Sequence, residues 1–171
     1  IAGFNYRMTE LQAAVCRVQL GKLDGLNAAR LKLVKQLNNG LRVFDFLVVP
    51  EEKYDCESTY YVYPLKFLSE IAGIKREQFV EAVNAEGINF FQGYVKPLYT
   101  QPVYQKRSLF KNGYPFSAIE NKSCRMEYNI GICPNAEKLY FDQMIINEHI
   151  RLPNTEEDVR DIINAIHKIV T

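Results

Sequence analysis

The sequence predicts an α+β protein in which a long N-terminal helical arm precedes a small antiparallel or mixed sheet with helices on one face. Three observations predict this class. An apolar stripe at helical spacing fills the first 40 residues, strand-like and helix-like segments alternate after residue 43, and an amphipathic helical pattern closes the chain. We therefore divide the 171 residues into an arm, 1–42, and a small α+β domain, 43–171.

The arm is expected to begin as a helix after Thr9, because residues 9–12 form a capping box. Gly21 and Gly25 indicate a break or kink, and residues 38–40 (Asn-Asn-Gly) are typical of a left-handed helix end. Cys16 falls inside the helical pattern and is expected to be buried. The apolar stripe consists of Leu11, Val15, Val18, Leu23, Leu26, Leu33 and Leu37.

The small domain is expected to open with a strand over the aromatic and β-branched residues 60–67. Residues 75–86 predict a helix that stops at Gly87, and residues 88–91 predict a second short strand. Residues 94–114 are rich in Pro, Tyr and Gln without any period, which predicts an extended loop. Long ordered loops of this kind are usually functional.

The last third predicts a helix, a strand and a helix. Pro134 stands where a helix is expected to start, and the apolar residues 143–152 indicate a strand that crosses the core. Thr155 is expected to cap the last helix, with acidic residues 156–158 in its first turn. The buried stripe of this helix is expected to be Val159, Ile162, Ile163, Ile166 and Ile169.

Composition and charge exclude several classes of protein. With 47% hydrophobic and 24% charged residues the chain is globular, and its formal net charge of +1 without a basic stripe predicts no nucleic-acid partner. No apolar stretch approaches the roughly 20 residues that span a bilayer, so we expect no membrane partner. The four cysteines include no C-x-x-C pair, so we expect no metal site. Without a secretory leader, free thiols and a cytoplasmic location are expected.

The residues alone leave two interpretations open at each candidate site. Asn5 and Arg7 precede a helix N-terminus, where they would either hold a phosphate or simply cap the helix. His149 is either a half-buried histidine packed at a sheet edge or an imidazole that faces a ligand. The recurring tyrosines, Tyr94 and Tyr99 among them, would line a sugar-like pocket or pack in the core. Nucleophile-elbow, phosphate-loop and dinucleotide motifs are all missing from the sequence.

The run GFNYRMTELQAA, residues 3–14, resembles the G-x-N-Y-R-M-T-E-L-Q-A-A motif of the DegT/DnrJ/EryC1/StrS aminotransferases. These are fold-type-I enzymes that use pyridoxal 5'-phosphate (PLP) to aminate keto-sugars and keto-cyclitols. Further agreement at residues 97–102, 133–137 and 157–159 extends the resemblance over essentially the whole chain. It implies that residues 43–171 are the small domain of such an enzyme, which the arm links to a large PLP domain outside this chain.

This resemblance implies a PLP-dependent transaminase that takes its amino group from glutamate or glutamine. The lysine that forms the Schiff base with PLP is expected upstream of Ile1, so no lysine of this chain is given a catalytic role. The chain alone is then expected to be inactive, as a fragment or processed product that begins without Met. The alternatives are a non-catalytic family member that acts as a binding or regulatory protein, and an unrelated α+β interaction module.

The resemblance also implies roles for five residues. Asn5 matches the asparagine that contacts the PLP phosphate in the neighbouring subunit, which implies a homodimer with shared active sites. Arg7 would orient substrate or fix its loop, and Tyr94 lies in the loop that borders the substrate. Tyr99 stands where many nucleotide-sugar enzymes have histidine. The surroundings of His149 resemble the cyclitol and amino-hydroxybenzoate branch, in which this histidine faces substrate. Nucleotide-linked sugars and cyclitols or free sugars both stay open as substrates.

Overall fold

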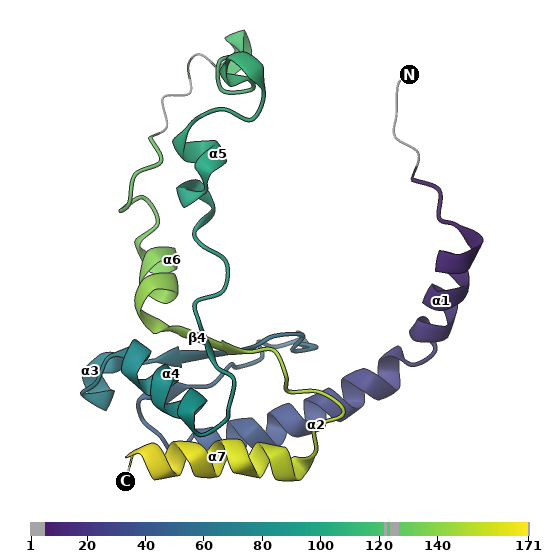
Figure 1. The fold of residues 1–171 in the computed structure, drawn as a ribbon, viewed down its shortest axis with the longest axis vertical. Coiled ribbons are helices and arrows are strands. Elements are labelled where there is room, and N and C mark those ends of the chain that lie inside the picture. Colours follow the sequence, from purple (N-terminus) through teal and green to yellow (C-terminus); the bar gives the residue numbers. More distant parts are fainter. Residues whose placement is uncertain (1–5, 122, 124–126, 171) are drawn as a thin grey trace.

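The structure, a computed structural model, describes residues 6–121, 123 and 127–170. Its centre is a four-stranded sheet in the order β1-β2-β4-β3, with antiparallel pairing between each pair of neighbours. The predicted α+β class is therefore confirmed (Figure 1). The strands are β1 (Leu47–Val48), β2 (Tyr63–Phe67), β3 (Phe91–Gln92) and β4 (Met144–Asn147).

Helices cover one face of this sheet and also form two projections from it. The α-helices are α1 (Glu10–Leu20), α2 (Leu23–Leu41), α3 (Ser69–Ala72), α4 (Arg76–Ala85), α5 (Pro102–Gln105), α6 (Pro134–Lys138) and α7 (Glu156–Val170). Single turns of 3₁₀ helix lie at Leu98–Thr100, Lys111–Gly113 and Ile119–Asn121, and a π-helical segment at Leu139–Gln143 leads into β4.

The core lies between the sheet and three helices. In β2 the side chains of Tyr63, Leu65 and Phe67 are buried, whereas Lys66 between them is exposed, as expected for a strand with one covered face. The side chains that cover this face come from α2 (Leu33, Val34, Leu37, Leu41), α4 (Phe79, Val80, Val83) and α7 (Val159, Ile162, Ile166). The predicted apolar stripes of α4 and of the last helix thus face the core.

The predicted helical arm is two helices with different surroundings. The capping box is confirmed, since the Gln12 amide donates to Thr9 Oγ1 and the Thr9 amide to Gln12 Oε1. The predicted break is also present, because α1 ends before Gly21. None of the residues of α1 is buried, so the expectation for Cys16 is wrong. Only the second half of α2 enters the core, which leaves the first half of the stripe exposed.

Gly40 is a packing residue and does not end the helix. The prediction of a left-handed helix end at residues 38–40 is wrong, because α2 continues to Leu41. A Cβ atom on Gly40 would overlap the side chain of Ile163 on α7. The glycine therefore lets the two helices approach closely, and this close contact joins the end of the arm to the last helix of the small domain.

The strands are shorter than the sequence predicts, whereas the starts of α6 and α7 agree with the prediction. β2 begins at Tyr63 because Tyr60 adopts a φ of 46°, outside the strand region. The second strand occupies residues 91–92 and not 88–91, since Phe90 turns into the core. Pro134 at the start of α6 is confirmed, as is Thr155 at the start of α7, where its Oγ1 accepts from the Glu157 amide.

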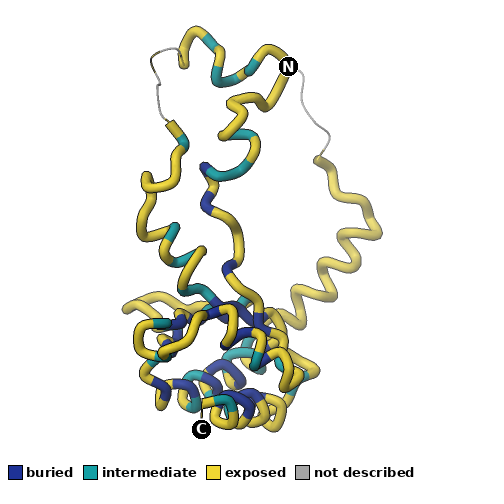
Figure 2. The backbone as a smooth tube through the Cα atoms, turned by 60° about the vertical axis from the view of Figure 1, so that its left-hand side comes forward, coloured by how far each residue is buried: buried dark blue, intermediate teal, exposed yellow. Residues whose placement is uncertain are grey.

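Residues 93–143, called the excursion here, leave the sheet after β3 and return to it at β4. The excursion contains α5, α6 and the short 3₁₀ turns, and it rises from the sheet on the side away from α7 (Figure 1). The predicted loop 94–114 forms its outgoing half and holds α5 besides irregular chain. Most of the described part of the excursion is exposed, and its buried residues lie between the base and mid-height (Figure 2). α1 is the second projection and stands opposite it.

Candidate functional site

Tyr94 and Tyr99 both lie on the outgoing half of the excursion, but in different surroundings. Tyr94 is exposed, and its ring meets the ring of Tyr61 edge-on at a centroid distance of 6.5 Å. Tyr61 belongs to the segment that enters β2, so this contact places Tyr94 next to the sheet. An exposed aromatic ring beside a sheet edge is suited to stack against a sugar or cyclitol ring.

Tyr99 is a buried connector between the two halves of the excursion. Its side chain is 7% exposed, and its hydroxyl donates to Glu137 Oε1 on the returning half. The same carboxylate oxygen accepts from the backbone amides of Gly131 (2.8 Å) and Cys133 (3.2 Å). The Tyr99 hydroxyl proton is therefore committed to a contact within the excursion.

The electrostatics of this pair follow from the same contacts. Burial, together with the hydrogen bond to Glu137 and its charge, raises the pKa of Tyr99 to about 12. The Tyr99 hydroxyl lowers the pKa of Glu137, and the amides of Gly131 and Cys133 lower it further. At neutral pH the site thus holds a neutral phenol bound to a carboxylate, which is a stable donor–acceptor pair.

His149 lies just beyond β4, where hydrogen bonds fix its backbone on both sides. Its amide donates to Asn147 Oδ1 (2.7 Å), and its carbonyl oxygen accepts from Asn154 Nδ2 (2.6 Å). Asn147 is itself buried, at 3% exposure, and donates to the carbonyl oxygen of Asn89 (3.0 Å). This network presents the imidazole at the surface, so His149 is exposed and not half-buried.

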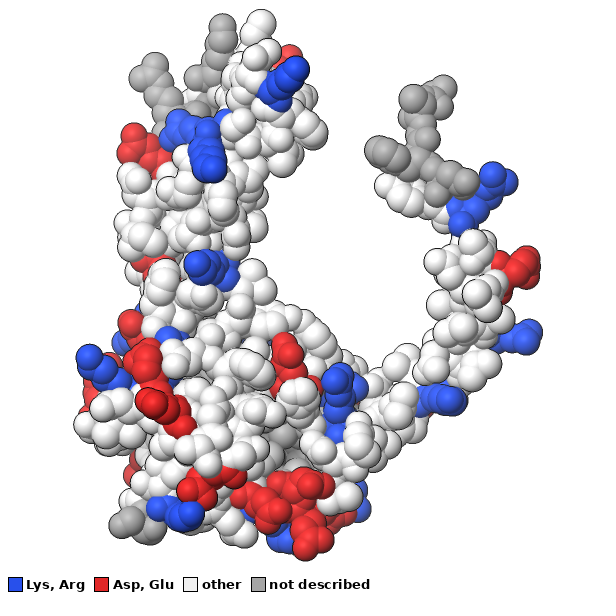
Figure 3. Space-filling model, viewed as in Figure 1, with Lys and Arg blue, Asp and Glu red and all other residues white. Residues whose placement is uncertain are grey.

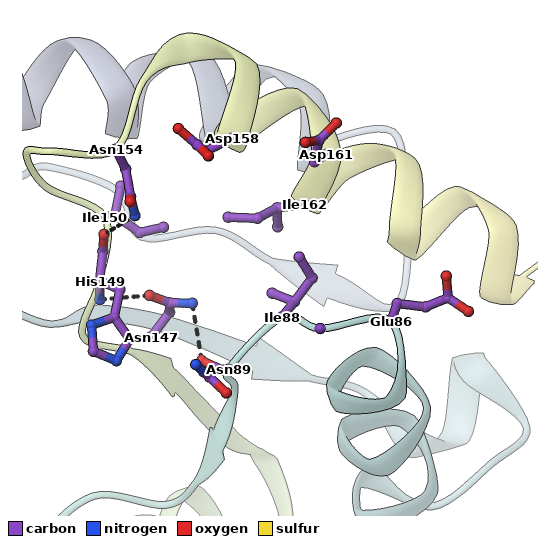
Figure 4. A pocket seen from close by; sticks show the side chains of 11 residues that line it. Glu86, Ile88, Asn89, Asn147, His149, Ile150, Asn154, Asp158, Asp161 and Ile162 are labelled. Atoms are coloured by element: carbon purple, nitrogen blue, oxygen red, sulfur yellow. Dashed lines mark hydrogen bonds between the residues drawn. The ribbon is translucent and has the colours of Figure 1, made fainter.

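The imidazole of His149 lines a pocket of about 490 Å³ between the β4–α7 connection and the end of α4. Ile88 and Ile162 form its apolar floor, and His149 and Asn89 lie at one side (Figure 4). Asp158 and Asp161 on α7 give its other side a negative charge, which belongs to the acidic surface that gathers over α7 (Figure 3), whereas the Glu86 carboxylate is paired with Lys168 at 2.7 Å.

Arg7 lies on the other projection, just before α1, and Asn5 lies outside the described residues. Arg7 is exposed, and Thr9 two residues later caps the helix. α1 presents its N-terminal amides toward the far end of the projection, opposite the middle of the excursion between α5 and α6 (Figure 1). A guanidinium beside free helix amides has the chemistry to hold a phosphate.

The four described candidates come from three parts of the structure. Tyr94 and Tyr99 share the excursion, Arg7 stands across from them at the tip of α1, and His149 lies near the sheet at the opposite end of β4 from the excursion (Figure 1). The sides of the excursion and of α1 that face each other are largely uncharged in Figure 3. Any site that uses all four residues therefore needs further protein between the two projections.

Two residues of this region could not be identified as candidates from the sequence. Glu137 belongs to the segment 133–137 that carries the family resemblance, but its contact with Tyr99 spans 38 positions. Arg76 is a buried arginine at the start of α4 that donates to backbone carbonyls 64 to 68 positions away. A signal for either contact would require knowledge of which distant segments meet, and one sequence does not contain it.

No group of three or more His, Cys, Asp or Glu residues in the described part of the chain is placed to hold a metal ion. None of the helices described is both long and apolar enough to cross a membrane.

Comparison with known proteins identifies the family. The model of the DegT/DnrJ/EryC1/StrS aminotransferase family matches residues 1–167. A Micromonospora echinospora protein named "Putative L-glutamine:3-amino-2,3-dideoxy-scyllo-inosose aminotransferase" is 28% identical over 99% of this chain and 40% of its own length. An uncharacterized protein of Methanocaldococcus jannaschii is 26% identical over 99% of this chain and 38% of its own.

The fold agrees with this match. The X-ray structure of an aminotransferase from Psychrobacter cryohalolentis superposes with a TM-score of 0.75 at 20% identity, over 98% of this chain and 40% of that one. The chain thus spans about two fifths of the length of the curated relatives it matches. With a family model that covers nearly all of its residues, the chain belongs to the DegT/DnrJ/EryC1/StrS aminotransferase family.

Proposed function

We propose that the chain is the C-terminal segment of a PLP-dependent aminotransferase that transfers an amino group from glutamate or glutamine to a keto-sugar or keto-cyclitol. The observation that carries this proposal is the family match over residues 1–167, which includes the run GFNYRMTELQAA. PLP supplies the electron sink for amine transfer when it is bound. The protein chain supplies binding, orientation and exclusion of water around it.

The residues before α1 are proposed to bind the cofactor phosphate. Arg7 and the first amides of α1 form a donor set that suits an anion, and the proposed partner of the phosphate, Asn5, lies directly beside them in sequence. We assign none of the lysines of this chain to the Schiff base, and we expect the 171-residue chain alone to be inactive.

The dimer is part of the same proposal. Leu11, Val15 and Val18 on α1 are all more than half exposed. An apolar face of this kind is unfavourable in water and is typical of a surface that other protein covers. We propose that the large domain and a second subunit cover it, so that Asn5 and Arg7 serve the neighbouring active site. A cytoplasmic location also belongs to the proposal, supported by the free thiols of Cys16, Cys56 and Cys133.

For the acceptor we favour a keto-cyclitol or free keto-sugar over a nucleotide-linked sugar. The Tyr99 hydroxyl donates to Glu137 and is thereby withheld from a nucleotide, whereas the imidazole of His149 is exposed and held by its backbone. The Micromonospora relative, named for glutamine and an amino-inosose, supports the same class and glutamine as donor. Tyr94 contacts Tyr61, which precedes β2 at the strand end where Tyr63 pairs with Asn147, and His149 follows Asn147 by two residues. An acceptor bound at this end of the sheet would stack on Tyr94 and accept or donate a hydrogen bond at His149.

The test uses the full-length protein with PLP. We expect a visible absorption band that borohydride abolishes, with the cofactor then attached to a lysine outside residues 1–171. Glutamine should shift the band, and a keto-cyclitol should restore it faster than a nucleotide-linked keto-sugar does. His149→Ala should raise the KM of the acceptor, and His167→Ala on α7 serves as the matched control. A full-length protein without the band would favour a non-catalytic binding role.

A further inference from the structure

A buried arginine lies at the base of the excursion, at the point where the chain returns to the sheet. Arg76, the first residue of α4, is 6% exposed. Its Nη1 donates to the carbonyl oxygens of Tyr140 (2.9 Å) and Met144 (3.2 Å), and its Nη2 to that of Phe141 (2.7 Å). These three carbonyls belong to the end of the π-helical segment and the start of β4.

The same guanidinium also reaches the outgoing end of the excursion. Nη2 lies 3.4 Å from Oε1 of Gln92, the last residue of β3, and 3.2 Å from Oε1 of Glu77. Directly after Gln92, the Gly93 amide donates to the Met144 carbonyl at 2.8 Å. One side chain thus contacts both ends of a 51-residue segment, 93–143, which otherwise departs from the sheet.

The chemistry of this position requires an arginine. The last carbonyls of a helix lack partners within the helix, and a cation there is favoured by the helix dipole. A guanidinium carries four N–H donors on two separate terminal nitrogens, Nη1 and Nη2, and so reaches more acceptors than the single ammonium nitrogen of lysine with its three donors. A buried charge is retained only where such acceptors surround it. α4 supplies a firm support, because Phe79 and Val83 on its buried face are fully enclosed in the core.

We propose that Arg76 is a positioning residue of the acceptor site, which fixes the direction in which the excursion leaves the sheet. Tyr94 follows Gln92 by two residues, so the position of its ring depends on how the base of the excursion is held. Farther from the sheet, the Tyr99–Glu137 contact joins the outgoing and returning halves of the excursion. This inference rests on the proposed function, since it assigns a substrate-presenting role to the excursion.

The first part of the test measures hydrogen exchange in the full-length protein. In Arg76→Gln, the amides of Gly93 and of residues 98–101 and 103–105 should exchange about tenfold to a hundredfold faster, as expected when hydrogen bonds from a charged donor are lost. Amides of α2 and α7 should be unchanged. Arg76→Lys should recover part of the protection. The matched control is Arg30→Gln, because Arg30 also donates to a backbone carbonyl, that of Thr59, but far from the excursion.

The second part measures transamination. Arg76→Gln should raise the KM of the keto acceptor about tenfold, with the rate of the half-reaction with glutamine unchanged, and Arg76→Lys should recover part of this loss. Unchanged exchange in the excursion, or an equal effect of Arg30→Gln, would overturn the inference. Faster exchange with an unaltered acceptor KM would overturn the positioning role as well.

The two proposals fail in different ways. A full-length wild-type protein that forms no cofactor band contradicts the proposed function, and the positioning role fails with it, while exchange still reports whether Arg76 holds the excursion. If Arg76→Gln does not fold, Gly93→Ala loosens the same base from the other side, since its Cβ would lie 2.8 Å from Tyr140 Cε2. An acceptor KM unchanged in that variant, with faster exchange, overturns the inference.

Discussion

α1 and the excursion both project from the part of the structure that contains the sheet, but they differ in the long-range contacts that hold them. α1 has no buried residue, and Leu11 on it is 76% exposed. The excursion is bridged at its base by Arg76, at mid-height by Tyr99 and Glu137, and higher by Gln105, whose Nε2 donates to the carbonyls of Tyr99 (2.8 Å) and Tyr128 (2.7 Å).

The upper part of the excursion adds an aromatic cluster to these bridges. The ring of Tyr104 lies 5.2 Å from that of Tyr128 and 6.3 Å from that of Phe116, and the Arg107 guanidinium lies 5.9 Å from the Tyr128 ring. Such contacts stabilise an irregular segment that has no sheet of its own. An isolated helix of 11 residues, by contrast, is marginal in water. The conformation of the excursion is therefore stabilised by its internal contacts, whereas the stability of α1 depends on the protein surface that covers it.

The largest expected difference in stability is between substitutions in the buried second half of α2 and substitutions in the exposed helix α1. In the 171-residue chain, Leu37→Ala should lower the free energy of unfolding by about 2–5 kcal/mol, because Leu37 is fully buried. Leu11→Ala should change it by less than about 0.5 kcal/mol. Urea unfolding measures both. In the full-length protein Leu11→Ala should become costly, and an equally small effect there would contradict the proposed cover over α1.

An intermediate effect is expected at the base of the excursion. Gly93 has a φ of +64°, and a Cβ there would lie 2.8 Å from the ring of Tyr140. Gly93→Ala should cost about 1–3 kcal/mol from crowding, in addition to backbone strain. Gly73→Ala is the matched control, since its φ is +70° with open space around it. Urea unfolding compares the two variants, and equal losses would show that crowding against Tyr140 has no part in holding the base.

The smallest effect is a local pH dependence at mid-height of the excursion. The pKa of Glu137 is lowered from its usual 4.5, so the contact with Tyr99 is fully formed above pH 4.5 and is lost as the pH falls through the lowered value. The pKa of Tyr99 is raised from 10.0 to about 12, so the contact is otherwise lost only as the pH rises toward 12. The amide resonance of Gly131 should report the acid transition by NMR. Glu137→Gln should abolish it, and an unchanged titration in that variant would assign the transition to another group.

Features that depend on neighbouring residues could be predicted from the sequence. Thr9 with Gln12 and Thr155 with Asp158 form their caps within one helical turn, so the pattern alone specifies them. The apolar stripe of α7 is likewise a property of its own 15 residues. The class of fold follows from the order of such elements.

Features that depend on distant residues could not be predicted. From the sequence, Gly40 is typical of a helix end. Its role in packing depends on the contact with Ile163, more than 100 positions later. From the sequence, Arg76 resembles an ordinary surface residue at a helix start, and its role depends on the distant carbonyls of residues 140–144. Tyr99 resembles a ligand contact, and its role depends on the distant carboxylate of Glu137. The exposure of Leu11 and Val15 could not be foreseen either, because an amphipathic pattern does not say which protein surface covers it.

The close contact between Gly40 and Ile163 also governs the order in which the domain can form during synthesis. The α2–α7 interface joins the early part of the chain to the late part, and β4, which lies between β2 and β3, is also made late. While the ribosome is still translating the excursion, the apolar side chains of α2 and β2 have no α7 to cover them. The core around α2 and β2 can therefore be completed only after α7 emerges, and until then the nascent chain exposes apolar surface that is prone to aggregate.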